Sequence, residues 1–243
     1  MLPVAVLAVI LVLWELLVKL KDIKEYILPS PSAIAREFVV SFNLLVSHTA
    51  ITLVETITGF IIGLITAVFL SLLLDKFMTL KMTVYPYLIV TQTIPLVALA
   101  PILAIWFGFG LLPKIILSVL VVFFPITLSL TEGLSSYDRD LYEMMTQMGA
   151  SKKQIFLKLK IPSASVHFFS GLKIAAAYCV MGAVISEWVG AQKGLGIFLT
   201  RAMSSFQTAA LFADIIIIIV ISLVLFKTIQ FIEKKTIRWR TEK

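Results

Sequence analysis

The residues that could carry out chemistry in this chain are few, and they lie near the ends of long apolar stretches. His48 and His167 have no acidic residue at a spacing that would complete a metal site or a hydrolytic site, so we expect interfacial histidines. A charge inside a membrane is costly, but a long side chain near the end of a span reaches the polar interface. We therefore expect the charged residues at the ends of the apolar stretches to be solvated. For Glu187, a functional role is an equally good interpretation. The charges concerned are Glu15, Glu55, Glu132, Lys173, Glu187 and Asp214.

No segment of the chain has the pattern needed to hydrolyse a nucleotide. A phosphate-binding loop requires G-x-x-x-x-G-K-[ST] after a strand. The nearest approach, GASKKQ at residues 149–154, lacks both the second glycine and a preceding strand. We therefore expect no catalytic residue, no metal and no cofactor in this chain.

Residues 138–162 form a charged segment between two apolar stretches, and their pattern predicts two helices joined by a glycine. Asp138 is suited to cap the helix that begins RDLYEMMTQM, and Gly149 is suited to the left-handed conformation that ends it. Ser151 and Gln154 have the spacing of a capping box, which opens a second helix that Pro162 closes.

One face of the first of these helices is apolar and rich in methionine. It consists of Leu141, Met144, Met145 and Met148. Flexible methionines suit a surface that keeps contact with a moving partner. On spacing alone, an amphipathic connector resting on the bilayer is an equally good interpretation.

The composition identifies the elements that must position these residues as membrane helices. Of 243 residues, 60% are hydrophobic and 14% are charged, whereas soluble domains have about 25% charged residues. Apolar segments cover about 3–18, 56–75, 85–108, 115–133, 168–188 and 209–230. Runs this long exclude the alternating pattern of a membrane β-barrel. We predict an all-α polytopic membrane protein with about six transmembrane helices.

We expect a single transmembrane domain over residues 1–243. Its first helix is 1–20, an outer loop with an amphipathic segment is 21–55, and the core is 56–243 with a cytoplasmic loop at 134–167. The loops 76–84 and 134–173 and the tail after 226 hold 14 of the 21 Lys and Arg residues. The positive-inside rule therefore places them and both termini in the cytoplasm. Because the bases flank apolar runs, the net charge of +7 does not indicate a nucleic-acid partner.

Two apolar segments have features of a translocation path. In the third, Pro95 has Gln92 and Thr93 beside it and Pro86 and Pro101 on either side. Proline breaks a helix, and a broken helix with polar neighbours is expected to line a path, although a static packing kink is the alternative.

The fifth segment is rich in small residues, which favour close helix packing first and path lining second. The small residues are Gly171, Ala175, Ala176, Ala177, Gly182 and Ala183. From this helix we assign Tyr178 and Gly182 to the candidate path, beside Gln92, Thr93, Pro95 and Pro101 of the third segment.

The segment at 143–162 resembles a known motif. Glu143-Met-Met-x3-Gly149-x9-Leu159-x-Ile161-Pro162 is similar to E-A-A-x3-G-x9-I-x-L-P, the "EAA" loop of permease subunits in binding-protein-dependent ABC importers. The glutamate, glycine and proline are in register. Both alanines are methionine here, at positions 144 and 145.

Four further stretches resemble the nitrate, sulfonate, taurine and thiamine-pyrimidine branch of these permeases. They are LPSPSAIAREF (28–38), HTAITLVETITGFIIG (48–63), QTIPLVALAPILAIWFGFG (92–110) and EWVGAQKGLG (187–196). Residues 171–191 and 201–208 are most similar to hydroxymethylpyrimidine permeases, so a thiamine-pyrimidine precursor is the expected solute. Sulfonate, taurine and nitrate are the alternatives.

The resemblance implies a type I ABC importer permease of the prokaryotic cell membrane, with a coupling helix at about 143–155 seated in a cytoplasmic ATPase. ATP and Mg²⁺ belong to that ATPase, an extracytoplasmic binding protein delivers the solute, and a second copy completes a homodimer. The expected ATPase contacts are Glu143, Met144, Met145, Gly149, Ala150, Ser151, Gln154 and Pro162. A glycine-rich outer turn contacts the binding protein through Glu187, Gly190, Gly194 and Gly196.

Three other functions compete with this one. A secondary transporter or channel would have internal repeats, paired mid-span charges or an ion filter, and none is evident in the sequence. An intramembrane enzyme would need convergent acidic and histidine residues. A structural membrane subunit would leave the 134–167 loop unexplained.

Overall fold

The chain folds into helices joined by short turns. The structure is a computed structural model and describes residues 2–237; position 1 and positions 238–243, which include the end of the basic tail, lie outside the described residues. The helices are α1 (Leu2–Leu20), α2 (Pro31–Val40), α3 (Phe42–Lys76), α4 (Met78–Thr91), α5 (Leu96–Phe107), α6 (Leu111–Gly133), α7 (Arg139–Gln147), α8 (Lys152–Ile155), the π-helical η1 (Phe156–Lys160), α9 (Ile161–Glu187), α10 (Leu195–Ser204) and α11 (Thr208–Thr236). The expected all-α fold is confirmed.

Four helices within the described residues are long and apolar enough to cross a membrane: α3, α6, the continuous helix Lys152–Glu187, and α11. The α4–α5 pair is a fifth if it crosses as one span, and its two halves are bent by 102°. This break falls at residues 92–95, where Pro95 precedes the first turn of α5. The break that the prolines predict is therefore present.

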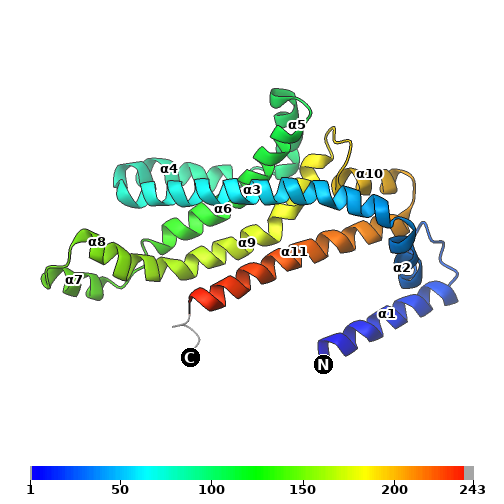
Figure 1. Cartoon of the computed structure of the whole chain (residues 1–243), viewed down its shortest axis with the longest axis horizontal. Coiled ribbons are helices and arrows are strands. Elements are labelled where there is room, and N and C mark those ends of the chain that lie inside the picture. Colours follow the sequence, from blue (N-terminus) through cyan, green and yellow to red (C-terminus); the bar gives the residue numbers. More distant parts are fainter. Residues whose placement is uncertain (1, 238–243) are drawn as a thin grey trace.

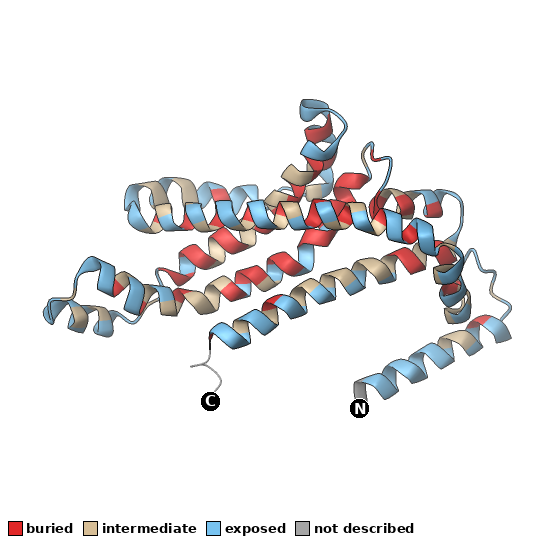
Figure 2. Ribbon diagram, viewed as in Figure 1, coloured by how far each residue is buried: buried red, intermediate tan, exposed pale blue. Residues whose placement is uncertain are grey.

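Close packing of α3, α6 and α9 forms the centre of the molecule (Figure 1). Gly59 of α3 lies against Ser118 of α6, and Gly182 of α9 lies against Val121 of α6. A Cβ atom at either glycine would collide with these neighbours, so the small residues let the helices approach. The buried residues concentrate along this contact (Figure 2), which leaves the outer faces to lipid.

Two helix boundaries differ from the sequence prediction. α3 begins at Phe42, so residues 42–55, expected in a loop, continue the helix. The coupling region at 143–155 comprises the end of α7, a turn at Gly149 and α8, as the glycine and the capping box predict. Pro162 does not close a helix, because it lies in the first turn of α9 directly after η1.

The wide π-helical turn explains how the chain accommodates this proline. Proline in a continuous helix collides with the carbonyl four residues earlier. In η1 the N–H of Ile161 bonds the carbonyl of Phe156, five residues earlier, which widens the helix immediately before Pro162. The helix therefore continues from Lys152 to Glu187 instead of ending.

Candidate functional site

The segment from Asp138 to Ile155, which we call the α7 segment, projects from one end of the bundle (Figure 1). Asp138 caps α7, because its Oδ1 accepts hydrogen bonds from the N–H groups of Asp140 (2.9 Å) and Leu141 (3.1 Å). A capping box opens α8: the N–H of Ser151 donates to Gln154 Oε1 at 2.7 Å, and Ser151 Oγ accepts from the Gln154 N–H at 3.3 Å. Both predicted caps are present.

Gly149 ends α7 in the conformation that the sequence predicts. Its φ is +77°, in the left-handed region that favours glycine. The N–H of Gly149 donates to the carbonyl of Thr146, and the N–H of Ala150 donates to the carbonyl of Met145, both at 3.0 Å. This pair of bonds is a Schellman motif, which turns the chain sharply from α7 into α8.

The surface of α7 is accessible over its whole length, with no buried residue. Met144 and Met148 are exposed by 51% and 78%, and Glu143 lies beside them with an exposed carboxylate. After α7, Ser151 and Gln154 are exposed and Ala150 is half-buried. An exposed apolar patch with a polar rim is typical of a protein interface. Met145 and Pro162 are only half-buried, so the expected partner contacts are available for binding.

Buried contacts connect the α7 segment to the membrane helices. Ile155 and Leu159 are buried below α8 and η1. Lys160 of η1 forms an ion pair with Asp75 at the end of α3, at 2.7 Å, and its Nζ lies 5.3 Å from the centre of the Tyr137 ring. The residues that follow α8 therefore contact the end of α3 and continue directly into α9.

The α4–α5 break presents polar groups at the surface. Gln92, Thr93 and Pro95 are exposed, and Thr93 Oγ1 donates to the carbonyl of Val90 at 2.7 Å. Pro101 within α5 is exposed as well, as is Tyr178 of α9. Gly182 is buried against α6, which fits the packing role that small residues favour first.

At the other end of the molecule a buried polar cluster holds the turn between α9 and α10. We use this name for Glu187, Thr52, His48, Glu55 and Lys114. Glu187 accepts hydrogen bonds from Thr52 Oγ1 at 2.6 Å and from the Gly196 N–H at 2.5 Å. His48 Nδ1 lies 2.7 Å from the carbonyl oxygen of Gly194, and Lys114 Nζ lies 2.9 Å from Glu55 Oε1.

This cluster corrects several sequence expectations. Glu187 and Glu55 are 0% and 1% exposed, and His48 is 4% exposed, so none of them is solvated or interfacial. Asp214 is fully buried too, and its carboxylate has no partner among residues 2–237. The reason is that α3 begins well before its apolar core, so His48 and Glu55 lie within a packed helix. Glu187 is the last residue of α9, and the turn that leads into α10 covers it.

The turn itself, residues 188–194, has two glycines in left-handed conformations, Gly190 (φ +71°) and Gly194 (φ +130°). A side chain at Gly194 would collide with the Glu187 carboxylate, and one at Gly196 with the backbone of Val184. Glu187 therefore lies beneath the turn, and the accessible surface is formed by its neighbours Trp188, Gln192 and Lys193.

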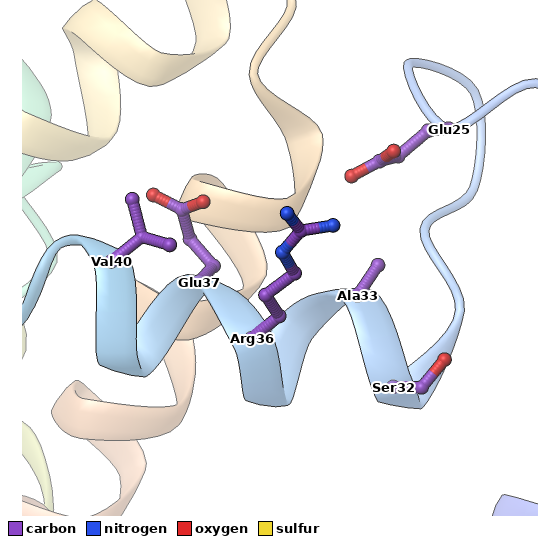
Figure 3. Close-up of a pocket in the computed structure, with 6 residues that line it drawn as sticks. All are labelled: Glu25, Ser32, Ala33, Arg36, Glu37 and Val40. Atoms are coloured by element: carbon purple, nitrogen blue, oxygen red, sulfur yellow. The ribbon is translucent and has the colours of Figure 1, made fainter.

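A charged pocket beside α2 was not identified from the sequence. Figure 3 shows Arg36 and Glu37 on one side of α2, with Glu25 of the preceding loop across from the guanidinium. The pocket has a volume of about 550 Å³, and Ser32, Ala33 and Val40 complete its lining. The signal in the sequence was the adjacent charges Arg36 and Glu37, but only the fold brings Glu25 to them.

Comparison of the sequence with known proteins finds membrane components of transport systems. A family model described as "Binding-protein-dependent transport system inner membrane component" matches residues 59–238. The formylaminopyrimidine transport permease protein ThiX of Halalkalibacterium halodurans is 36% identical over 239 residues, which cover 98% of this chain and 95% of the relative.

Two further relatives are similar over most of their length. A probable ABC transporter permease protein of Haemophilus influenzae is 34% identical over 230 residues, covering 95% of this chain and 94% of the relative. The riboflavin transport system permease protein RibX of Chloroflexus aurantiacus is 33% identical over 240 residues, covering 98% and 89%.

Proposed function

Because this chain belongs to the family of binding-protein-dependent transport system inner membrane components, we propose that it is the permease subunit through which an ATP-driven importer moves a small solute. The observation that carries the proposal is the α7 segment. An accessible methionine-rich helix, closed by a Schellman turn at Gly149, is joined to two membrane helices by buried contacts. Such an arrangement serves to receive movement from a partner.

The partner at α7 is a cytoplasmic ATPase, which binds ATP and Mg²⁺. Glu143, Met144 and the turn from Gly149 to Ser151 form the contact surface. When the ATPase subunits close, α7 moves with them, and η1 and the Lys160–Asp75 pair pass the movement to α9 and α3. The expected contact at Pro162 is indirect, since this residue is half-buried at the base of α9.

Two copies of the chain surround the path, and the α4–α5 break contributes to its lining. Gln92, Thr93, Pro95, Pro101 and Tyr178 are the lining residues, supported by their exposure in the isolated chain. Gly182 does not line the path; it supports the lining helices by letting α9 pack closely against α6.

The turn at residues 188–194 receives the solute-binding protein on the extracytoplasmic side. Gly190 and Gly194 give the turn its shape, and Glu187 and Gly196 hold it from below. Both termini are then cytoplasmic, because the helices before α2 and after α10 run toward the α7 end (Figure 1), where the basic loops lie.

The solute we propose is a pyrimidine precursor of thiamine. The similarity to a relative named for formylaminopyrimidine transport, at 36% identity, supports this choice. Riboflavin, sulfonates, taurine and nitrate are the competing solutes. No arginine lies within the described residues of the α4–α5 pair or of α9 to bind an anionic solute there.

Co-purification with the ATPase encoded beside this chain tests the subunit assignment. The wild-type chain in detergent is expected to retain the ATPase at a 1:1 ratio. Met144→Glu should reduce the amount of retained ATPase, because it places a charge on the apolar face of α7. Met203→Glu, at an exposed side chain of α10, is the control and should not reduce it. A chain that transports solute without any bound ATPase would instead be a secondary transporter or channel.

Thermal unfolding of the associated binding protein tests the solute. The ligands are hydroxymethylpyrimidine, formylaminopyrimidine, riboflavin, taurine, an alkanesulfonate and nitrate. A ligand at 100 times its Kd should stabilise the binding protein by about 2.7 kcal/mol. Stabilisation by a sulfonate or nitrate alone would reject the pyrimidine and leave the importer assignment intact.

A further inference from the structure

A groove beside the α7 segment combines lysine side chains with an apolar floor. It has a volume of about 730 Å³ and lies between the end of α3, α7 and the start of α8. Its lysines are Lys76, Lys152, Lys153 and Lys160. Lys160 is paired with Asp75, whose carboxylate also lines the groove. The other three lysines form no ion pair among residues 2–237, so the groove carries an excess of positive charge.

The floor of the groove is continuous with a lipid-facing surface. Leu72, Phe77, Ile155 and Phe156 contribute its apolar lining. Above Leu72, one face of α3 carries exposed apolar side chains at intervals of three or four residues, which places them in one stripe that ends at Lys76. The stripe consists of Ile57, Ile61, Ile65, Phe69 and Leu72. Because α3 is long and apolar enough to span a membrane, this stripe lies at the depth of the acyl chains.

We propose that this groove binds an anionic phospholipid. Its phosphate group lies among Lys76, Lys152 and Lys153, and its acyl chains lie along the α3 stripe. Basic pockets at the cytoplasmic ends of membrane helices are suited to anionic headgroups. An acidic peptide or a soluble phosphate would satisfy the lysines but would leave the apolar floor and the stripe uncovered, so a lipid fits both halves of the surface.

The position of the groove gives this lipid a consequence for coupling. Tyr142 of α7 lines the same groove as Lys76 of α3. A bound headgroup therefore contacts the membrane helix and the α7 segment at once, and it restrains α7 against the bundle. This consequence depends on the proposed importer function, whereas the binding of the lipid does not.

Native mass spectrometry of the purified chain tests the binding. The protein in nonionic detergent is titrated with dioleoyl phosphatidylglycerol, with dioleoyl phosphatidylcholine, or with glycerol 3-phosphate. We expect one retained phosphatidylglycerol per chain, little phosphatidylcholine, and no competition from equimolar glycerol 3-phosphate. In the triple variant Lys76→Gln, Lys152→Gln, Lys153→Gln, the affinity for phosphatidylglycerol should fall on the order of 100-fold.

Two matched variants separate the groove from general charge and from misfolding. The first control variant loses the same charge from α11, outside the groove, through Lys227→Gln, Lys234→Gln and Lys235→Gln. It should bind the lipid as the wild-type chain does. The second control variant preserves the charge of the groove through Lys76→Arg, Lys152→Arg and Lys153→Arg. It should bind the lipid as well. Equal loss of lipid in the α11 variant, or retention in the glutamine variant of the groove, would overturn the proposal. Displacement of phosphatidylglycerol by glycerol 3-phosphate would show that the groove binds a free phosphate group rather than a lipid.

The same titration on the chain assembled with its ATPase distinguishes the two candidate occupants. Retention of the lipid in the assembly supports the proposal. Complete loss of the lipid would show that the ATPase fills the groove, and the proposal would be wrong. If the lipid binds but ATP hydrolysis in the assembly is the same in phosphatidylglycerol and phosphatidylcholine vesicles, the binding site stands and the effect on coupling is rejected.

Discussion

At the residue scale, the buried polar cluster shows how a membrane protein uses charge for structure. Lys114 of α6 and Glu55 of α3 are both buried and lie 2.9 Å apart, so each neutralises the other where neither can reach water. Glu187 has no lysine but satisfies its carboxylate with the hydroxyl of Thr52 and the N–H of Gly196. Side chains with the composition of an active site thus hold three helices and a turn together.

Removal of one member of the buried pair should destabilise the fold. Lys114→Met leaves Glu55 unpaired, and breaking a buried pair costs about 3–5 kcal/mol. We expect a lower unfolding temperature in detergent, measured by intrinsic fluorescence. Lys193→Met, at an exposed lysine of the nearby turn, is the control and should change it little. The double variant Glu55→Gln, Lys114→Met should recover part of the loss, and an unchanged melting temperature in Lys114→Met would contradict the structural role.

The second prediction at this scale concerns Gly149. No atom lies within 4 Å of a Cβ built there, so the requirement for glycine comes from its φ of +77° alone. For other L-residues the left-handed conformation costs about 1–2 kcal/mol. Gly149→Val should therefore reduce solute uptake into vesicles about tenfold, whereas Gly149→Asn, which tolerates this conformation, should remain close to wild type. Normal uptake by the valine variant would show that the turn is not needed for coupling.

At the scale of elements, the continuous helix from Lys152 to Glu187 connects the α7 segment at one end of the molecule to the polar cluster at the other. Its π-helical turn at Phe156–Lys160 is the irregular point. π-helical turns of this kind occur frequently at functional positions. Here Lys160 also forms an ion pair with Asp75 of α3, and we propose that movement of α7 enters the bundle at this point.

Loss of the Asp75–Lys160 contact should weaken coupling without abolishing hydrolysis. In Asp75→Asn, the ATPase should still bind α7 and hydrolyse ATP, while the solute moved per ATP should fall about 2- to 30-fold. The ratio is measured in proteoliposomes that contain the full transporter. Glu132→Gln, at an exposed carboxylate of α6, is the control. An unchanged ratio in Asp75→Asn would place the coupling route elsewhere.

The α4–α5 break permits a test of the path. In a Cys179→Ala background, single cysteines at Gln92 and Thr93 should react with a polar maleimide, because they face water in the path. A cysteine at Ile65, on the exposed apolar face of α3, should react slowly, because it faces lipid. Equal reactivity at all three positions would reject the break as part of the path. Cys179 is the single cysteine of the chain, so this background leaves the introduced cysteine as the one reactive thiol.

At the scale of the whole molecule, much of the apolar surface is uncovered in the single chain. Most of the described side chains of α1 are exposed (Figure 2). In α5, Ile105 and Trp106 are exposed as well. Lipid covers such surface in a membrane, and a second copy covers part of it in a dimer. We expect detergent complexes to contain two copies of this chain and two ATPase subunits, measured by light scattering. A transporting complex that contains one copy of this chain and one ATPase subunit would reject the dimer.

The sequence alone predicted the features that depend on local order. Asp138, Ser151 and Gln154 are caps because their side chains bond the backbone within three residues, and Gly149 ends α7 because few other residues adopt its φ. Long apolar runs can only be membrane helices, so the all-α polytopic fold followed from hydropathy. The EAA-like segment indicated the family, and the match over residues 59–238 confirmed it.

The burial of polar residues in one cluster depends on how distant segments of the chain pack together. Glu55 and Lys114 are 59 positions apart in the chain, and Thr52 and Glu187 are 135 apart. Hydropathy therefore placed Glu55 at the solvated end of its own span, and it left a functional role equally open for Glu187. The lysine-rich groove likewise exists only because α3 ends beside the start of α8. Local bonding and hydropathy act along a single segment, whereas the pairing of charges depends on which helices pack against each other, and in this chain that depends on the small residues along α3, α6 and α9.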